Sequence, residues 1–167
     1  MKKFINVVVF LLGISLIMTA CSTKKNTAEP KISLKFIVSD LSEEEFQSVG
    51  TAELIDPAKE DFKKLEFKLD VEHSNKITNR KITKPDFRAI INSQESGRYW
   101  FGESSRQDNK NDTFASYGDQ IVFYAKGLNE KAIKEIFKAA EVNISWTTAE
   151  GQNQEKVFNL GDVVEFK

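Results

Sequence analysis

Two segments in which every second residue is apolar constrain the fold of this chain more than any other feature. They are 32–38 (ISLKFIV) and 65–72 (LEFKLDVE). Successive side chains of a β-strand point to opposite faces, so a period of two predicts strands with one buried and one solvated face. Such strands are typical of antiparallel sheets. We therefore expect a mainly β domain.

The chain after residue 31 consists largely of short apolar runs separated by turn residues. Further strands are expected at 77–82, 87–91, 99–102, 113–117, 121–125 and 142–146, with a weaker one at 49–55. The segment 157–166 is expected to form one or two closing strands with a bend at Gly161. One crossover helix is expected at about 129–141, because Asn129 can cap it and the apolar residues that follow recur at helical spacing. This order favours a two-sheet sandwich that resembles an immunoglobulin domain in outline, with a small β-barrel as the alternative.

The first 21 residues have the pattern of an export signal. Two lysines precede an apolar run at 4–18, and small residues and a cysteine follow it. The segment Met18-Thr19-Ala20-Cys21 resembles the lipobox of bacterial lipoproteins, in which a lipid is attached to the cysteine and the preceding peptide bond is cut. Met18 stands where that family usually has leucine, valine or isoleucine. The resemblance implies a signal peptide at 1–20 and a lipidated Cys21. The polar residues after Cys21 predict a flexible tether, so that 21–30 comprises the lipidated cysteine and the tether, and the remainder is expected to form one domain at 31–167.

An uncleaved transmembrane anchor is the alternative for this leader. As a helix, residues 4–20 would span roughly 25 Å, which is short for a hydrocarbon core of about 30 Å. Both alternatives leave the leader lysines on the cytoplasmic side of the membrane and the domain on the opposite side. We therefore expect a protein attached to the cell membrane by lipid on Cys21, facing the extracytoplasmic side.

Charge and cysteine usage narrow the function classes. The chain has 24 basic and 25 acidic residues, and 22 against 25 remain once Lys2 and Lys3 leave with the leader. This balance argues against a dedicated nucleic-acid binder. Cys21 is the only cysteine, so an exported domain must be stabilised by packing and not by an intramolecular disulfide.

The sequence contains no pattern that points to catalysis. His73 is the only histidine and is interpreted as a strand-end residue, and a Cys/His zinc site cannot form without further ligands. There is no nucleophile elbow and no phosphate-binding loop. We therefore predict no catalytic residues, no metal ligands and no cofactor.

The candidate binding surface is an aromatic run that comprises Arg98, Tyr99, Trp100 and Phe101. In a regular strand, Tyr99 and Phe101 share one face and Trp100 takes the other. One interpretation places part of this run in the core. The other makes its exposed members and Arg98 a platform for a sugar ring or a partner protein. The core interpretation is favoured.

Two charged segments are weighed as further sites. Residues 104–112 predict a mobile hairpin tip, and although Asp108 and Asp112 could bind calcium, Lys110 stands where such a loop needs an oxygen ligand. A solvated strand face is expected for four basic residues, Lys76, Arg80, Lys81 and Lys84. Anionic headgroups or wall polymers are the alternative partners of these four.

The sequence thus predicts a lipid-anchored extracytoplasmic protein with a noncatalytic binding or structural module. Its expected partners are the membrane, through Cys21, and an envelope protein or a glycan. Two alternatives remain open: an envelope hydrolase that uses dispersed carboxylates, and an inhibitor or immunity protein of an envelope factor.

Overall fold

A computed structural model describes residues 29–52 and 54–167 of the chain. The predicted signal peptide, Cys21 and most of the tether lie outside the described residues. The strands are β1 (Lys31–Asp40), β2 (Phe62–Glu72), β3 (Thr78–Thr83), β4 (Tyr99–Gln107), β5 (Phe114–Tyr124), β6 (Glu141–Thr147), β7 (Asn153–Asn159) and β8 (Glu165–Phe166). The helices are short: α2 (Glu43–Gln47), α3 (Phe87–Ile91), α4 (Glu130–Ile136), α5 (Leu160–Val163) and a 3₁₀ turn at Lys59–Asp61.

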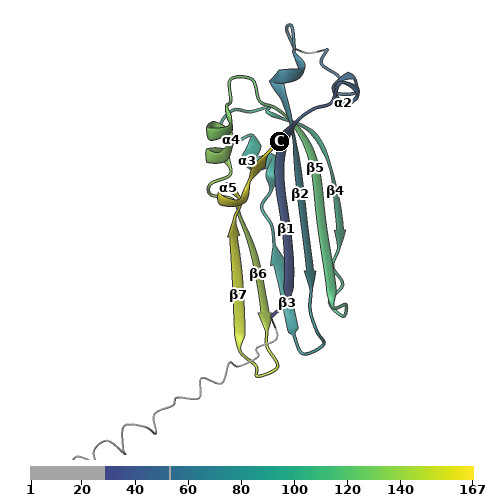
Figure 1. Cartoon of the computed structure of the whole chain (residues 1–167), viewed down its shortest axis with the longest axis vertical. Coiled ribbons are helices and arrows are strands. Elements are labelled where there is room, and N and C mark those ends of the chain that lie inside the picture. The colour runs from purple at the N-terminus through teal and green to yellow at the C-terminus, as the bar shows by residue number, and fades with distance from the viewer. Residues whose placement is uncertain (1–28, 53) are drawn as a thin grey trace, which may run out of the picture.

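The strands form two sheets that pack face to face (Figure 1). The larger sheet has the order β4-β5-β2-β1-β8, and the smaller has the order β3-β6-β7. Neighbouring strands are antiparallel except for β1 and β8, which are parallel. Neither sheet closes into a barrel, so the mainly β, two-sheet prediction is confirmed and the barrel alternative is excluded.

The main hydrophobic cluster lies between the sheets. Of the eight side chains that the two alternating segments predicted to be inward, Ile32 and Leu34 are half-buried and the other six are at most 2% exposed: Phe36, Val38, Leu65, Phe67, Leu69 and Val71. The helices α3, α4 and α5 lie next to the smaller sheet, on the same side of the larger sheet (Figure 1). Phe87 of α3 stacks on Phe36 of β1, with the ring centroids 5.8 Å apart. The described members of the two hydrophobic clusters lie between Ile32 and Phe166.

A second, smaller cluster lies on the opposite face of the larger sheet, near α2. It buries Leu41, Val49, Phe62 and Val122. Trp100 packs against these residues and donates a hydrogen bond from Nε1 to the carbonyl of Val49 at 2.8 Å. The weak strand predicted at 49–55 is wrong, because Val49 is buried here as part of a loop.

The structure corrects three further predictions. Residues 87–91 form a helix and not a strand, because Asp86 caps them by accepting from the Ala89 amide at 3.2 Å and their apolar side chains also fit helical spacing. The helix predicted at about 129–141 is shorter, since a turn follows Ile136 and β6 begins at Glu141.

The segment 157–166 is divided into the end of β7, helix α5 and the short strand β8. The predicted bend at Gly161 lies within α5. A Cβ on Gly161 would lie 2.8 Å from the Cα of Lys138, so this glycine allows α5 to approach the end of the α4 segment closely.

The two ends of the sandwich differ. At one end β1 begins at Lys31, opposite Glu72, and the loops 73–77, 108–113 and 148–152 lie beside it (Figure 1). We call this the tether end, because the predicted tether precedes β1. α2 and the 3₁₀ turn lie at the far end (Figure 1).

Candidate functional site

β4 is an edge strand of the larger sheet with one free side. It pairs with β5, and in the part of the chain that the structure describes no strand lies on its other side. Residues 101–107 are all exposed to solvent. From Gly102 to Gln107 the register with β5 is regular. The unpaired backbone groups of such an edge can pair with another extended chain.

The smaller sheet does not cover β4. Its edge strand β3 and the residues after it reach the inner face of β5 and the β4–β5 turn, where Lys84 contacts Asp119 and Arg80 contacts Asp108. The side chains of β4 on the same face remain exposed as a result, and they are Gly102, Ser104 and Arg106.

A groove follows β4 between the two sheets. It consists of three adjoining hollows of about 400, 420 and 810 Å³, and the largest lies at the tether end. Lys84 and Ser104 line both the first and the second hollow, and Ile82 and Arg106 line both the second and the third. We call these three hollows together the β4 groove.

Asp119 on β5 is a buried carboxylate in this groove, only 3% exposed. The ammonium of Lys84 lies 3.0 and 2.9 Å from its two oxygens, and the hydroxyl of Ser104 donates to one of them at 2.5 Å. The alternation of β5 places Asp119 on the same face as Tyr117 and Ile121, so period-two analysis of this strand contained the signal for it. Its charge is balanced by Lys84, which suits it to joining the sheets rather than to removing a proton.

Arg80 on β3 is the second buried charge, with a side chain only 5% exposed. Its guanidinium lies 2.7 Å from the Asp108 carboxylate and also donates to three backbone carbonyls, those of Asn109, Asp112 and Phe114. It lies 2.6 Å from Nε2 of His73, which must therefore accept, and Nδ1 of His73 then donates to the Ser74 carbonyl at 2.9 Å. The predicted solvated strand face is thus wrong for Arg80 and Lys84.

The Asp108 and Tyr117 side chains share a hydrogen bond beside the groove, and each changes the pKa of the other. The hydroxyl of Tyr117 donates to Asp108 at 2.5 Å. Burial opposes ionisation of Asp108, but the hydrogen bonds from Tyr117 and Arg80 outweigh it and lower the pKa of Asp108. Burial and the neighbouring carboxylate raise the pKa of Tyr117 to about 12. Both groups therefore keep their ordinary protonation state at neutral pH.

The predicted hairpin tip has a defined structure. Residues 104–107 belong to β4, and the turn after them wraps around Arg80. The two carboxylates weighed as calcium ligands have other partners, because Asp108 binds Arg80 and Tyr117 and Asp112 accepts from the Asn109 side chain at 2.8 Å.

The four residues of the aromatic run do not share one surface. The register of β4 shifts between Tyr99 and Phe101, so that Tyr99 packs against the main cluster and Trp100 against the second one. Arg98 donates to the carbonyls of Tyr124 and Lys126 and pairs with Glu95. Phe101 is the most exposed of the three aromatic residues, at 43%. Contrary to the alternation expected for a regular strand, Tyr99 and Phe101 lie on different faces.

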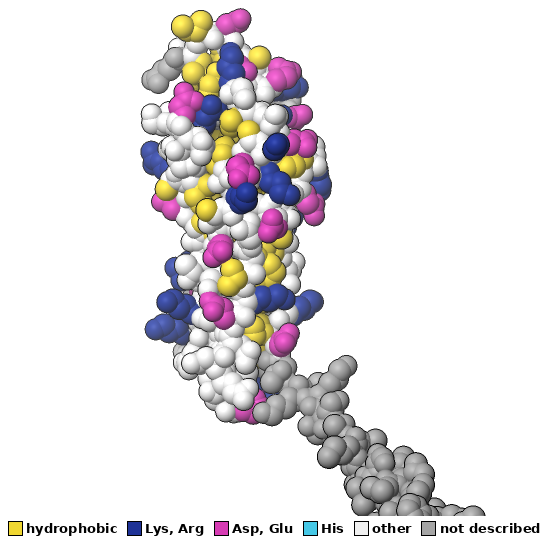
Figure 2. All heavy atoms as spheres, turned by 90° about the vertical axis from the view of Figure 1, so that its left-hand side faces the viewer, with side chains coloured by type: hydrophobic (Ala, Val, Ile, Leu, Met, Phe, Trp, Pro, Cys, Tyr) yellow, Lys and Arg dark blue, Asp and Glu magenta, His cyan; other side chains and the backbone are white. Residues whose placement is uncertain are grey.

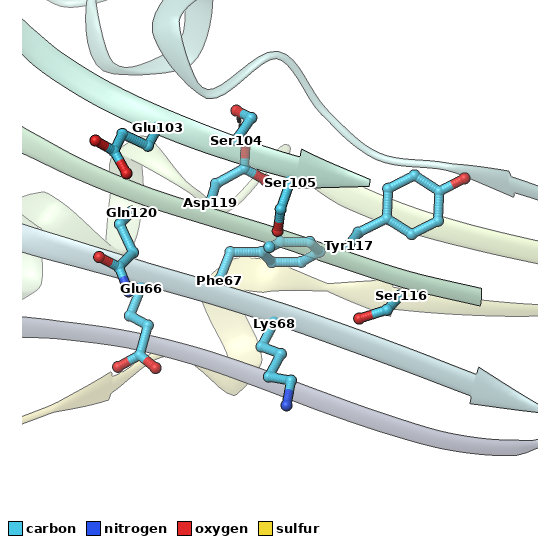
Figure 3. Close-up of a pocket in the computed structure, with 11 residues that line it drawn as sticks. Glu66, Phe67, Lys68, Glu103, Ser104, Ser105, Ser116, Tyr117, Asp119 and Gln120 are labelled. Atoms are coloured by element: carbon cyan, nitrogen blue, oxygen red, sulfur yellow. Dashed lines mark hydrogen bonds between the residues drawn. The ribbon is translucent and has the colours of Figure 1, made fainter. Parts of the chain in front are cut away.

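The outer face of the larger sheet carries a shallow hollow of about 320 Å³ around Gly118. Figure 3 shows Glu103, Gln120 and Glu66 in a row across β4, β5 and β2, which the strand registers confirm. Glu66 also binds Lys35 at 2.7 Å. On this face beside β4, Glu103 is the nearest charged side chain, and the Lys68 side chain lines the hollow on β2.

Comparisons with models of known protein families and with curated proteins found no match to this chain. Among residues 29–52 and 54–167, no group of three or more His, Cys, Asp and Glu side chains is arranged to hold a metal ion. No described helix is long and apolar enough to cross a membrane.

Proposed function

We propose that this chain is a membrane-anchored extracytoplasmic lipoprotein whose β-sandwich is a noncatalytic binding module. The anchor rests on the export signal and on the lipobox that ends at Cys21. The binding role rests on one structural observation, the free edge of β4 beside the β4 groove.

The partners of the buried charges favour binding over hydrolysis. Asp119 and Asp108 each face a basic side chain, and the Ser104 hydroxyl donates to a carboxylate whose charge Lys84 balances. A hydrolase that uses carboxylates needs one as a general base and another as an acid, with room for water between them. Asp108 and Asp119 are instead held in ion pairs that connect the sheets.

The orientation of the sandwich fits a module presented outside a membrane. A tether of ten residues, 21–30, reaches at most about 35 Å when fully extended. β4 runs along the long axis of the sandwich, so its free edge is accessible from the side (Figure 1). The face on the β7 and α4 side carries acidic and basic side chains interspersed, without a patch of one sign (Figure 2).

The anchor is tested by replacing Cys21 with alanine in the full chain and following incorporation of labelled fatty acid and the mass of the mature protein. Cys21→Ala should abolish both labelling and cleavage, while the neighbouring Ser22→Ala should leave them intact. A C21A chain that is still processed and labelled would overturn the lipoprotein assignment.

The binding role is tested by photocrosslinking in intact cells. A photoreactive residue at Phe101 or Ser105 on β4 should capture a recurrent partner. The matched control is Val157, which is 47% exposed on the edge strand β7 of the smaller sheet and should not capture it. Equal capture at all three positions would argue against a binding surface at β4.

A further inference from the structure

We propose that the β4 groove receives an extended acidic segment of a partner protein, which joins the larger sheet as an additional strand beside β4. This inference rests on the proposed binding function and specifies the chemistry of the partner. Three features carry it: the backbone of β4, the charges of the groove and the difference between the two faces of β4.

The backbone of β4 is suited to accept a strand. Natural edge strands are usually blocked by proline, by lysine, by bulges or by a covering loop. Between Gly102 and Gln107, β4 contains no proline and no lysine, and its register with β5 is regular. The register shift lies before this stretch, at Tyr99–Phe101. These six regular residues match the usual length of a strand.

The accessible charges of the β4 groove are mainly positive. Six basic and four acidic residues line it: Arg80, Lys81, Lys84, Arg88, Arg106 and Lys110 against Asp86, Asp108, Asp112 and Asp119. Lys84 and Arg80 are balanced by the two buried carboxylates described above.

The remaining acidic groups have roles within the fold, whereas two of the four remaining basic groups, Lys81 and Lys110, have no ion pair or ring contact among the described residues. The carboxylate of Asp86 caps α3, and that of Asp112 accepts from Asn109. Arg106 lies over the Tyr117 ring and 3.4 Å from the Asp108 carboxylate, yet its side chain is 67% exposed, and Arg88 lies over the Tyr99 ring. An occupant with negative charges therefore complements this groove.

The two faces of β4 define a pattern for the incoming strand. Side chains of an added strand that point into the groove would lie on the face of Gly102, Ser104 and Arg106, where Arg106 is the exposed charge of β4. Those that point to the outer face would lie beside Glu103, where acidic groups are repelled. Because strand side chains alternate, the structure favours a partner with acidic residues at every second position.

A second copy of this chain complements the edge less well. In an antiparallel pair of two β4 strands centred on Ser104, Arg106 would lie opposite Gly102 of the other copy, and no acidic side chain would face the basic ones. Centring the pair on Glu103 would place like charges opposite each other.

The test uses the full chain in detergent micelles and a capped peptide of nine residues, the length of β4, in which glutamate alternates with threonine. Binding is followed by NMR through the backbone amides of β4. One control peptide has the same composition with its glutamates in one block, and another has lysine in place of glutamate. We expect the alternating peptide to shift and protect the amides of Gly102–Gln107 and to bind about tenfold more tightly than either control.

Three protein variants separate recognition of the peptide from a general effect of charge. Arg106→Glu should weaken binding of the alternating peptide by about tenfold, and Arg106→Lys should restore most of it. Lys156→Glu on β7 makes the same change of charge at a different exposed edge and should leave the affinity unchanged.

Three results would overturn the inference. The first is that the alternating peptide does not bind. The second is that the peptide with its glutamates in one block binds equally well and the β4 amides do not change. The third is that the chain associates with itself through β4 in ultracentrifugation. None of these results affects the Cys21 labelling test, and capture of a partner at β4 in cells would preserve the binding function even if the acidic strand were wrong.

Discussion

The guanidinium of Arg80 on β3 lies 2.7 Å from the carboxylate of Asp108 at the end of β4, and this buried contact joins the two sheets at the tether end. Removing one member would leave the other charge buried without its partner. We expect Arg80→Ala to lower the free energy of unfolding by about 3–5 kcal/mol, measured by urea denaturation.

The matched control for this variant is Lys35→Ala, which removes an ion pair with Glu66 on the solvated face. Exposed pairs contribute little, so its effect should stay within about 1 kcal/mol. Equal destabilisation by the two variants would contradict the role given to Arg80.

Tyr117 should titrate later than an ordinary tyrosine. Its pKa is raised to about 12 in the folded state, against about 10 when unfolded. A raised folded pKa stabilises the fold below pH 10, and this stability is lost as the pH rises from about 10 to 12. Spectrophotometric titration should show one of the three tyrosines ionising last, and Tyr117→Phe should remove that late step.

Asp108 should contribute in the opposite pH range. Its pKa is lowered in the folded state because hydrogen bonds from Tyr117 and Arg80 outweigh the effect of burial. Its stabilisation is present above the unfolded value of about 3.9 and is lost as the pH falls through the lower folded value. Asp108→Asn should be less stable than the parent at pH 7 and should lose less stability on acidification. An identical acid dependence of the two proteins would exclude this contribution.

Trp100 and Phe101 should respond differently to truncation. Trp100 packs edge-on against Phe62 at 5.6 Å and donates to the Val49 carbonyl, so Trp100→Ala should cost about 3 kcal/mol of unfolding free energy. Phe101 is 43% exposed, and Phe101→Ala should cost under about 1 kcal/mol. Calorimetry of both variants tests this, and the reverse order would show that Trp100 is not part of the second cluster.

Thermal unfolding should be independent of reductant, because Cys21 is the only cysteine of the chain. The melting temperature of the monomer should be the same with and without dithiothreitol. A difference would indicate a disulfide between two chains, which Cys21→Ser would remove.

The sequence and the structure agree best where alternation is strongest. Leu65, Phe67, Leu69 and Val71 are buried as their spacing predicts. A strand with one apolar face finds hydrogen-bond partners for its backbone and removes that face from water only within a packed sheet. The segment 87–91 was misassigned because its apolar residues fit both periods, and the cap at Asp86 and the space beside Phe36 select the helix.

The candidate site was harder to predict from sequence. Tyr99 and Phe101 would share one face in a regular strand, yet a register shift of one residue places Tyr99 against the main cluster and Phe101 on the opposite face. Such a shift depends on how β4 fits β5 and on what packs behind it, which are contacts between residues distant in sequence.

The sequence by itself determined the mainly β character of the domain and the residues of its central strands, because side-chain periodicity is a local property. The predicted anchor at Cys21 likewise depends on a short contiguous motif. Only the tertiary structure decided which charges are buried and which strand edge is free. Arg80 and Lys84 belong to a basic segment in the chain but meet Asp108 and Asp119 across the sandwich, and β4 is exposed because the smaller sheet is too narrow to cover it.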